Sequence, residues 1–349
     1  MTQMATQTVE VTRVSNLSAN ENPLGPGPAA VTAMRQALER LHRYPPQDDL
    51  SLRQVLAACF GRGLTSDNFL AANGGVEVLG MIEDAVLADG GTAIICPPCF
   101  APYRVSLRAK GYGFTEVPLT RPDFRPDVDA ILAAVTDETR LLYLTNPNNP
   151  TGTWFGPEVL DRILDGLPEQ VTVIYDEVYW HFAAGLGLPD SVGLIGAGRN
   201  LVAVHSFSKA YGMAGARVGY ALAPEALIAR IAPLKRSYQL NTAALAGAVA
   251  ALGDTAHLAR TVANNDLERA RLVSGLRALG LETWESAANF AMFRCPEGIS
   301  ARALCDRLAE HGVLVRPAFD LPDHVRASVG TPEEVTHVLR ATEEVLRHV

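Results

Sequence analysis

Short, continuously apolar runs recur along the first two thirds of the chain and alternate with amphipathic stretches. The runs are rich in β-branched residues and lack the apolar/polar alternation of a half-exposed strand. This pattern predicts strands covered on both faces, as in a mainly parallel α/β sheet. The predicted strands are NFLAA (68–72), TAIIC (92–96), LLYLT (141–145), VTVIY (171–175), LVAVH (201–205) and VGYALA (218–223).

The stretches between these runs have helical spacing. In residues 49–60 the apolar positions fall on one helical face, and a second helix is predicted after Gly75. The face of the first helix consists of Leu52, Val55, Leu56, Cys59 and Phe60, and that of the second of Leu79, Ile82 and Val86.

The last hundred or so residues have a different pattern, in which helices flank two strands. A helix is predicted in 299–312, with Ser300 as its N-cap and Gly312 as its stop. VLVRP (313–317) and VRASVG (325–330) are predicted strands, and 331–346 is a closing helix. Thr331 and Glu334 form a capping box around Pro332 at the first helical position.

These patterns predict an α/β protein with two domains. We expect residues 41–240 to form a large domain around the mainly parallel sheet and residues 241–349 to form a smaller α+β domain. Residues 1–40 are proline-rich, and we expect them to pack with the small domain.

The composition argues against some classes of function. The 349 residues are 48% hydrophobic and 19% charged, which is typical of a globular protein. The net charge of -8 argues against nucleic acid as a partner. The most apolar run, 244–252, is too short to span a membrane, and no secretory signal is present. A cytoplasmic protein is therefore expected.

The chain has five cysteines in scattered positions, which does not indicate a disulfide framework. Cys96 and Cys99 form a C-x-x-C pair, but no second pair or histidine pair completes a zinc site. We therefore expect no metal site, and we interpret both cysteines as structural residues at a strand end.

Five consecutive predicted strands end in polar or glycine-rich sequence: Asn73-Gly74-Gly75, PPCF (97–100), NPNNPTG (146–152), DEVY (176–179) and SFSK (206–209). Ligands of parallel α/β sheets bind at the carboxyl ends of the strands. A glycine pair that opens a helix can offer backbone N–H groups to a phosphate. The defining glycines of the dinucleotide and P-loop motifs are missing.

Two cations lie in the otherwise apolar stretch 205–223, which reads HSFSKAYGMAGARVGYALA. These are Lys209 and Arg217, and the preceding strand end supplies Asp176 and Tyr179. A lysine that forms a Schiff base, together with an acid for a pyridine nitrogen, is the protein's contribution to pyridoxal phosphate chemistry.

The chain resembles the fold-type-I pyridoxal-phosphate aminotransferases of class I/II, and within them the histidinol-phosphate aminotransferase branch. The resemblance covers nearly the whole length. It implies a seven-stranded, mainly parallel sheet flanked by helices, and pyridoxal 5'-phosphate as cofactor. It is carried by SANENPLGPGP, RYP, NPNNPTG, DEVY, SFSKAYGMAGARVGYA, ANF and VRASVGTPEE, in that order.

The resemblance assigns catalytic roles to three residues. Lys209 would bind the cofactor as a Schiff base and then act as general acid and base. Asp176 would face the pyridine nitrogen, and Tyr179 the 3-oxygen. Asn149 would be the second donor to that oxygen, and Phe100 would stack on the ring, although a plain core aromatic is an equal reading of Phe100.

The resemblance also places the cofactor's phosphate and implies a homodimer. Ser206, Ser208 and Arg217 would hold the phosphate, with backbone N–H groups near Gly75 and Val76. Tyr44 in RYP would reach the phosphate from the neighbouring subunit; the alternative is a turn residue before Pro45.

The substrate would be held by Arg326, which matches the family's anion-binding arginine, and by Arg316, which could instead make a structural ion pair. Asn22 would lie close to the same pocket. We expect an aminotransferase that acts on histidinol phosphate or an amino acid with glutamate and 2-oxoglutarate.

Three alternatives stay open at this point: an aromatic or other amino-acid aminotransferase, a decarboxylase or lyase of the threonine-phosphate decarboxylase type, and a non-enzymatic sensor. The arm before ENP is short, and Leu24 and Val76 stand where relatives often have an aromatic residue and an aspartate. These departures concern the substrate and leave the transamination residues in place.

Overall fold

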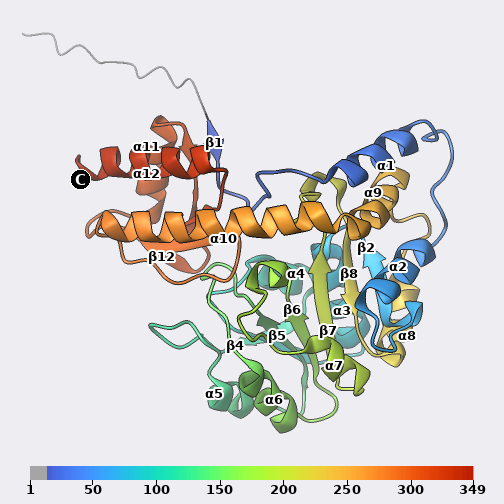
Figure 1. The fold of residues 1–349 in the computed structure, drawn as a ribbon. Coiled ribbons are helices and arrows are strands. Elements are labelled where there is room, and N and C mark those ends of the chain that lie inside the picture. The colour runs from blue at the N-terminus through green and yellow to red at the C-terminus, as the bar shows by residue number, and fades with distance from the viewer. Residues whose placement is uncertain (1–13, 349) are drawn as a thin grey trace, which may run out of the picture.

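The computed structural model describes residues 14–348, and its largest element is a seven-stranded sheet in the order β2-β8-β7-β6-β5-β3-β4 (Figure 1). All neighbouring strands are parallel except that β8 is antiparallel to both β2 and β7. The predicted mainly parallel α/β sheet is confirmed. Its strands are β2 (Phe69–Ala72), β3 (Thr92–Ile95), β4 (Gly113–Glu116), β5 (Thr139–Thr145), β6 (Thr172–Asp176), β7 (Leu201–Ser206) and β8 (Gly219–Leu222).

The inner strands of this sheet are covered on both faces, which explains why they are apolar without alternation, whereas the edge strand β4 is mostly exposed. In β5, Leu142 and Leu144 belong to one buried apolar cluster, while Leu141 and Tyr143 belong to another. The first cluster contains residues of α2 (Leu50–Phe60), α5 (Val128–Ala133), α6 (Pro157–Gly166), α7 (Ser191–Gly196) and α9 (Thr242–Gly253). The second contains residues of α3 (Gly75–Leu87), α4 (Pro102–Lys110) and α8 (Glu225–Ile231).

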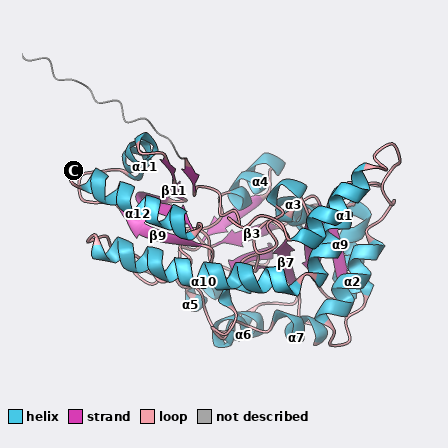
Figure 2. Cartoon of the chain, turned by 45° about the horizontal axis from the view of Figure 1, so that its top comes forward, coloured by secondary structure: helices cyan, strands magenta, loops and turns pink. Residues whose placement is uncertain are grey.

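A second, three-stranded antiparallel sheet has the order β11-β12-β9. It packs with helices α11 and α12 at the carboxyl end of the chain, and the long helix α10 runs from α9 to this part (Figures 1 and 2). The smaller α+β part is thereby confirmed. Its elements are β9 (Phe290–Arg294), β11 (Arg316–Ala318), β12 (Leu321–Ser328), α10 (Thr255–Ala278), α11 (Ala301–Glu310) and α12 (Pro332–Leu346).

The helix ends of this part follow the local sequence. The Ser300 hydroxyl accepts a hydrogen bond from the backbone N–H of Ala303 at 3.2 Å, as an N-cap does. Thr331 and Glu334 form the predicted capping box before α12. VLVRP was predicted as one strand, but it divides into β10 (Val313–Leu314) and β11, which pair with different partners.

The N-terminal segment joins both parts. β1 (Ser15–Asn16) pairs in parallel with β10, while α1 (Pro28–Leu38) packs on α9. The predicted domain limits at residues 40 and 240 stay a prediction, and the first residues of the short arm lie outside the described part of the chain.

The described residues also form four 3₁₀ turns: η1 (Ser66–Asn68), η2 (Trp180–Ala183), η3 (Ala214–Ala216) and η4 (Ala232–Leu234).

All five cysteines are free thiols, and Cys96 and Cys99 are buried just after β3. Burial raises the pKa of the Cys99 thiol to about 12, so this thiol stays protonated near neutral pH.

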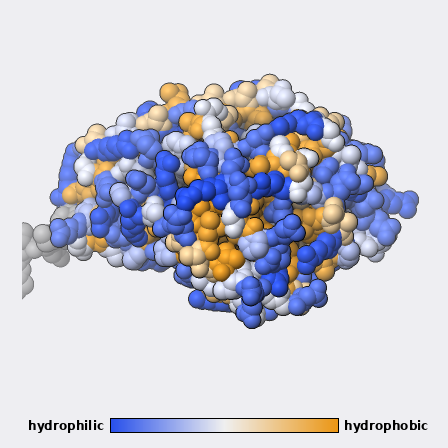
Figure 3. All heavy atoms as spheres, turned by 90° about the horizontal axis from the view of Figure 1, so that it is seen from below, coloured by the Kyte–Doolittle hydropathy of each residue, from blue (hydrophilic) through white to orange (hydrophobic). Residues whose placement is uncertain are grey.

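Among residues 14–348, no group of three or more His, Cys, Asp or Glu side chains is placed to hold a metal ion. No helix in the same range is long and apolar enough to cross a membrane. Apolar side chains on the face in Figure 3 lie among hydrophilic ones.

Candidate active site

A cavity of about 310 Å³ lies at the carboxyl ends of β5, β6 and β7, beside the start of α3. The N-terminal segment closes one side of it with Ala19, Asn20 and Glu21. Twelve of the residues predicted for the site line this cavity: Gly75, Val76, Phe100, Asn149, Asp176, Tyr179, Ser206, Ser208, Lys209, Arg217, Arg316 and Arg326. The parallel strands therefore bring together side chains that are far apart in the sequence.

Lys209 follows the end of β7 and is partly buried in the cavity. Its Nζ donates to the backbone carbonyls of Asn20 at 3.2 Å and Ala19 at 3.3 Å. Burial, and secondarily the positive charge of Arg326, lowers the pKa of Lys209 to about 8. A lysine with this pKa is in part unprotonated near neutral pH, as a nucleophilic amine must be.

Asp176 is the last residue of β6 and is 4% exposed. The Tyr103 hydroxyl donates to its Oδ2 at 2.6 Å, and the backbone N–H of Val178 donates to its Oδ1 at 3.3 Å. Burial raises the pKa of Asp176, while the hydrogen bonds from Tyr103 and Val178 lower it. Because Oδ1 accepts only that long bond within residues 14–348, it can still accept from a ligand.

Tyr103 was not predicted as a site residue. It lies in the first turn of α4, is 1% exposed, and its ring meets Phe100 edge-on at 5.5 Å between centroids. It stacks on Tyr143 at 4.6 Å on its other side. The sequence offered only one hint, which is a tyrosine three positions after Phe100.

Arg326 is a buried cation, 3% exposed, on the central strand of the second sheet. Its Nη1 donates to Asn149 Oδ1 at 2.5 Å and its Nη2 to the carbonyl of Ser18 at 2.9 Å, while its Nε has no partner in the described chain. Burial lowers the pKa of Arg326 to about 10. Within residues 14–348 it forms no ion pair with a carboxylate, so the site can accept an anion.

Arg316 lies opposite Arg326 in the β11–β12 register. Its guanidinium lies 4.8 Å from the ring centre of Phe319, and that of Arg326 lies 5.6 Å from the same ring. Two cations thus converge at one wall of the cavity. Neither forms an ion pair in the described part of the chain, so the structural alternative for Arg316 has no partner there.

The start of α3 has a geometry that suits an oxyanion. Gly74 has φ 85°, and a Cβ on it would lie 2.3 Å from Nη2 of Arg217. A Cβ on Gly219 would lie 2.4 Å from the backbone N of Gly75. The two glycines therefore let Arg217 and β8 approach the amino end of α3, where backbone N–H groups attract anions.

Two predicted site residues do not line the cavity. The Asn22 amide donates to the Ala210 carbonyl at 3.0 Å and to the Thr261 hydroxyl at 3.2 Å, so it fastens the N-terminal segment to the loop of Lys209. Tyr44 is 84% exposed, and its ring lies 5.1 Å from that of Tyr238. Their predicted contacts with substrate and with a partner's cofactor stay predictions.

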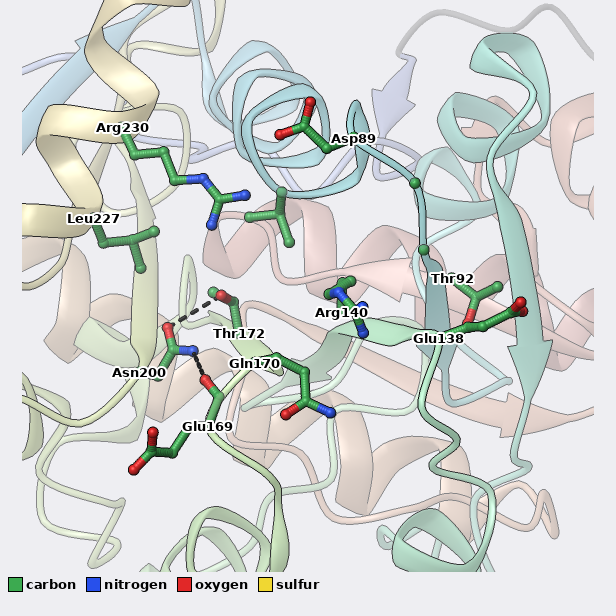
Figure 4. Close-up of a pocket in the computed structure, with 13 residues that line it drawn as sticks. Asp89, Thr92, Glu138, Arg140, Glu169, Gln170, Thr172, Asn200, Leu227 and Arg230 are labelled. Atoms are coloured by element: carbon green, nitrogen blue, oxygen red, sulfur yellow. Dashed lines mark hydrogen bonds between the residues drawn. The ribbon is translucent and has the colours of Figure 1, made fainter.

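A larger cavity of about 650 Å³ lies at the opposite edge of the sheet, at the amino ends of the strands (Figure 4). Arg140 and Arg230 face it together with Asp89, Glu138 and Glu169, so its charges are mixed. None of the predicted site residues lies there. Because ligands of parallel α/β sheets bind at the carboxyl ends of the strands, we assign the active site to the smaller cavity.

The residues of the smaller cavity fit pyridoxal phosphate. The aldehyde of this cofactor needs an amine, which the partly unprotonated lysine supplies. Its ring nitrogen needs a buried carboxylate with an oxygen that can still accept a hydrogen bond, and its phosphate needs a helix start paired with an arginine. The glycines at positions 74 and 219 leave backbone groups open at the phosphate end.

Residues 12–341 match the family model for aminotransferases of class I and II. The chain belongs to this family and is a pyridoxal-phosphate-dependent aminotransferase. It is similar to histidinol-phosphate aminotransferase 2 of Pseudomonas fluorescens, with 37% identity over 97% of this chain and 90% of the relative. It is also similar to the histidinol-phosphate aminotransferase of Akkermansia muciniphila, with 35% identity over 95% and 90% of the two chains.

Solved structures agree with this assignment. Histidinol-phosphate aminotransferase from Sinorhizobium meliloti, in complex with pyridoxal-5'-phosphate, superposes with a TM-score of 0.88 at 30% identity, covering 96% of this chain and 91% of that one. The predicted family, fold and cofactor are therefore confirmed. The lyase and sensor alternatives find no support among these relatives.

Proposed function

We propose that this chain transfers an amino group between histidinol phosphate and 2-oxoglutarate, with glutamate as the other amino compound. The observation that carries the proposal is Arg326, a buried cation without a carboxylate partner in the described chain, beside Lys209 and Arg316. The substrate phosphate and the carboxylate of glutamate are both oxyanions that a guanidinium binds. The names of the relatives support histidinol phosphate as the donor.

The cofactor's phosphate is bound, in this proposal, by Ser206, Ser208, Arg217 and the backbone N–H groups of Gly75 and Val76. Ser208 N–H already donates to the Ser206 hydroxyl at 3.0 Å, which holds this loop in a fixed shape. Phe100 lines the cavity and would cover one face of the ring.

Pyridoxal phosphate supplies an electron-withdrawing ring that stabilises the negative charge left when a carbon next to the amine loses its proton. Asp176 would accept from the ring nitrogen through Oδ1, which otherwise accepts only the long bond from Val178. Tyr179 and the Nδ2 of Asn149 donate to the 3-oxygen, since Asn149 uses its Oδ1 for Arg326. Lys209 would hold the cofactor and would move the proton at the reacting carbon, because its pKa of about 8 lets it give and take a proton near neutral pH.

We also propose that the enzyme is a homodimer in which Tyr44 reaches the neighbouring site. Large apolar or aromatic side chains are exposed in two segments near each other, which a second copy would cover. These are Leu38, Leu41 and Tyr44 in one segment, and Leu234 and Tyr238 in the other. The ring contact between Tyr44 and Tyr238 joins the two segments.

We place the enzyme in the cytoplasm. The absence of disulfides among its five cysteines supports a reducing compartment. The amino donor and the 2-oxo acid are then small molecules that enter from solution.

The proposal is tested with a panel of donors against 2-oxoglutarate. Histidinol phosphate, histidine, phenylalanine, tyrosine and aspartate are compared by kcat/KM from glutamate formation. We expect histidinol phosphate to exceed the others. A higher value for an aromatic amino acid would replace the donor, and carbon dioxide release without glutamate would overturn the transamination itself.

A further inference from the structure

Asn20 lies where the N-terminal segment, the loop of Lys209 and the second sheet meet. It is 1% exposed and has φ 54°, a left-handed conformation that asparagine tolerates. Its carbonyl accepts from Lys209 Nζ at 3.2 Å and from Asn289 Nδ2 at 3.0 Å. One buried backbone group therefore contacts both the lysine and the second sheet.

The side-chain amide of Asn20 has a fixed direction. The Ser328 hydroxyl accepts from the backbone N–H of Asn20 at 2.8 Å and donates to its Oδ1 at 3.2 Å. The Nδ2 then points the other way and donates to the Tyr179 hydroxyl oxygen at 3.0 Å. Since Nδ2 can only donate, Tyr179 must act as the acceptor in this bond.

This arrangement leaves the Tyr179 proton for another partner. The hydroxyl makes no further hydrogen bond within residues 14–348, and Tyr179 lines the cavity. A hydroxyl that accepts one hydrogen bond donates more strongly in the next. Burial raises the pKa of Tyr179, whereas Arg326 and the Asn20 bond lower it.

We propose that Asn20 is a positioning residue: held by Ser328, it strengthens Tyr179 as a proton donor to the cofactor's 3-oxygen. Through this donor it sets the pH at which the nitrogen linking Lys209 to the cofactor loses its proton. The inference rests on the proposed function, because it requires pyridoxal phosphate in this cavity with Tyr179 at its 3-oxygen.

Other charges also act on Lys209 and Tyr179. They are Arg326 from β12, Asp176 from β6, Glu21 from the N-terminal segment and Arg217 after η3, and the Lys209 ammonium itself lies 5.8 Å from the Tyr179 ring centre. Asn20→Gly leaves all of these in place, so its change in titration reports the Asn20 bond, whereas Asn20→Asp also adds a buried negative charge beside Lys209.

The test is a pH titration of the visible absorbance of the holoenzyme without substrate. Asn20→Gly removes the amide and suits the positive φ, and Asn20→Asp replaces the donor with a carboxylate that draws the Tyr179 proton to itself. Both weaken the bond to the 3-oxygen, leave more charge on it and favour the protonated linkage. We expect the titration midpoint to rise by roughly half a unit to one unit in Asn20→Gly and by more in Asn20→Asp.

Asn16→Asp is the matched control, because it adds the same charge to an exposed position of the same segment. Its midpoint should equal that of the wild type. Equal midpoints for wild type, Asn20→Gly and Asn20→Asp would overturn the inference. A wild type that binds no cofactor would instead overturn the proposed function, and the inference with it.

Ser328→Ala keeps the test decisive if the Asn20 variants fail to fold or to bind cofactor. It leaves Asn20 in place but removes the hydroxyl that orients its amide. A rise of the midpoint in the same direction as in Asn20→Gly, but smaller, supports the inference, and an unchanged midpoint contradicts it.

Discussion

The charged residues of this site are shielded from water and are poised to bind a ligand or to react. Asp176 keeps Oδ1 for a donor, Arg326 keeps Nε for an anion, and Lys209 has a lowered pKa. Such groups are costly in a protein without a ligand, and they cluster where chemistry occurs.

Replacing Tyr103 by Phe should weaken catalysis while leaving the fold intact. The variant loses the 2.6 Å bond to Asp176, so the carboxylate holds a proton more tightly and competes with the ring nitrogen for it. We expect kcat to fall by about 10- to 100-fold, as for a lost hydrogen bond to a charged group worth about 1.5–3 kcal/mol. Steady-state kinetics measures this.

Tyr143→Phe is the control for that variant. It removes the 2.7 Å bond to Glu83 but not the one to Asp176. Its kcat should stay near that of the wild type. Equal losses in both variants would show that the bond from Tyr103 to Asp176 has no specific part in catalysis.

The pKa of Lys209 has a consequence for stability in the cofactor-free protein. Lys209 has a pKa of about 8 in the folded protein, below its ordinary value of 10.5, so its buried charge lowers the free energy of unfolding, and this destabilisation is complete below pH 8. Between pH 8 and 10.5 the unfolded chain binds more protons than the folded one, so this cost shrinks as pH rises.

Lys209→Met should therefore raise the melting temperature of the cofactor-free protein at pH 7, on the order of a few degrees. The gain should become smaller toward pH 10. Differential scanning calorimetry at several pH values measures both. A gain that is independent of pH would mean that the ammonium is not the source of the cost.

At the scale of elements, we propose that β8 and the start of α3 together form the phosphate end of the site. Gly219→Ala would place a Cβ 2.4 Å from the Gly75 backbone N, and a backbone must then shift. We expect the dissociation constant for pyridoxal phosphate, measured by absorbance titration, to rise at least about tenfold, since backbone donors at a helix start are lost.

Gly215→Ala in η3 is the matched control, because a Cβ there meets nothing within 4 Å. Its affinity for pyridoxal phosphate should be unchanged. If Gly219→Ala binds the cofactor equally well, the close approach of β8 has no part in the phosphate site.

The elements also show where sequence reasoning succeeds. The strand ends carrying Asp176 and Lys209 could be predicted because a local apolar run stops at a polar group. The roles of Asn20 and Tyr103 could not, since their hydrogen bonds join positions 159 and 73 residues apart. The division of VLVRP depends likewise on two different partner strands, which no local pattern encodes.

At the scale of the whole molecule, we propose that two copies complete each site, with Tyr44 of one copy reaching the site of the other. Mixing Tyr44→Ala with Lys209→Ala under exchange conditions should restore activity to about a quarter of the wild type, because half of the dimers carry one intact site. Neither variant alone should be active to this extent. A mixture no more active than the sum of its parts would place Tyr44 outside the site.

The most direct test of the central claim is chemical. Holoenzyme is reduced with borohydride, digested, and its peptides are weighed by mass spectrometry, with Lys209→Ala treated in parallel. The account predicts the mass of reduced pyridoxal phosphate on the peptide that contains Lys209, and neither label nor visible absorbance in the variant. A label on another lysine, or an absorbance that survives in Lys209→Ala, would contradict it.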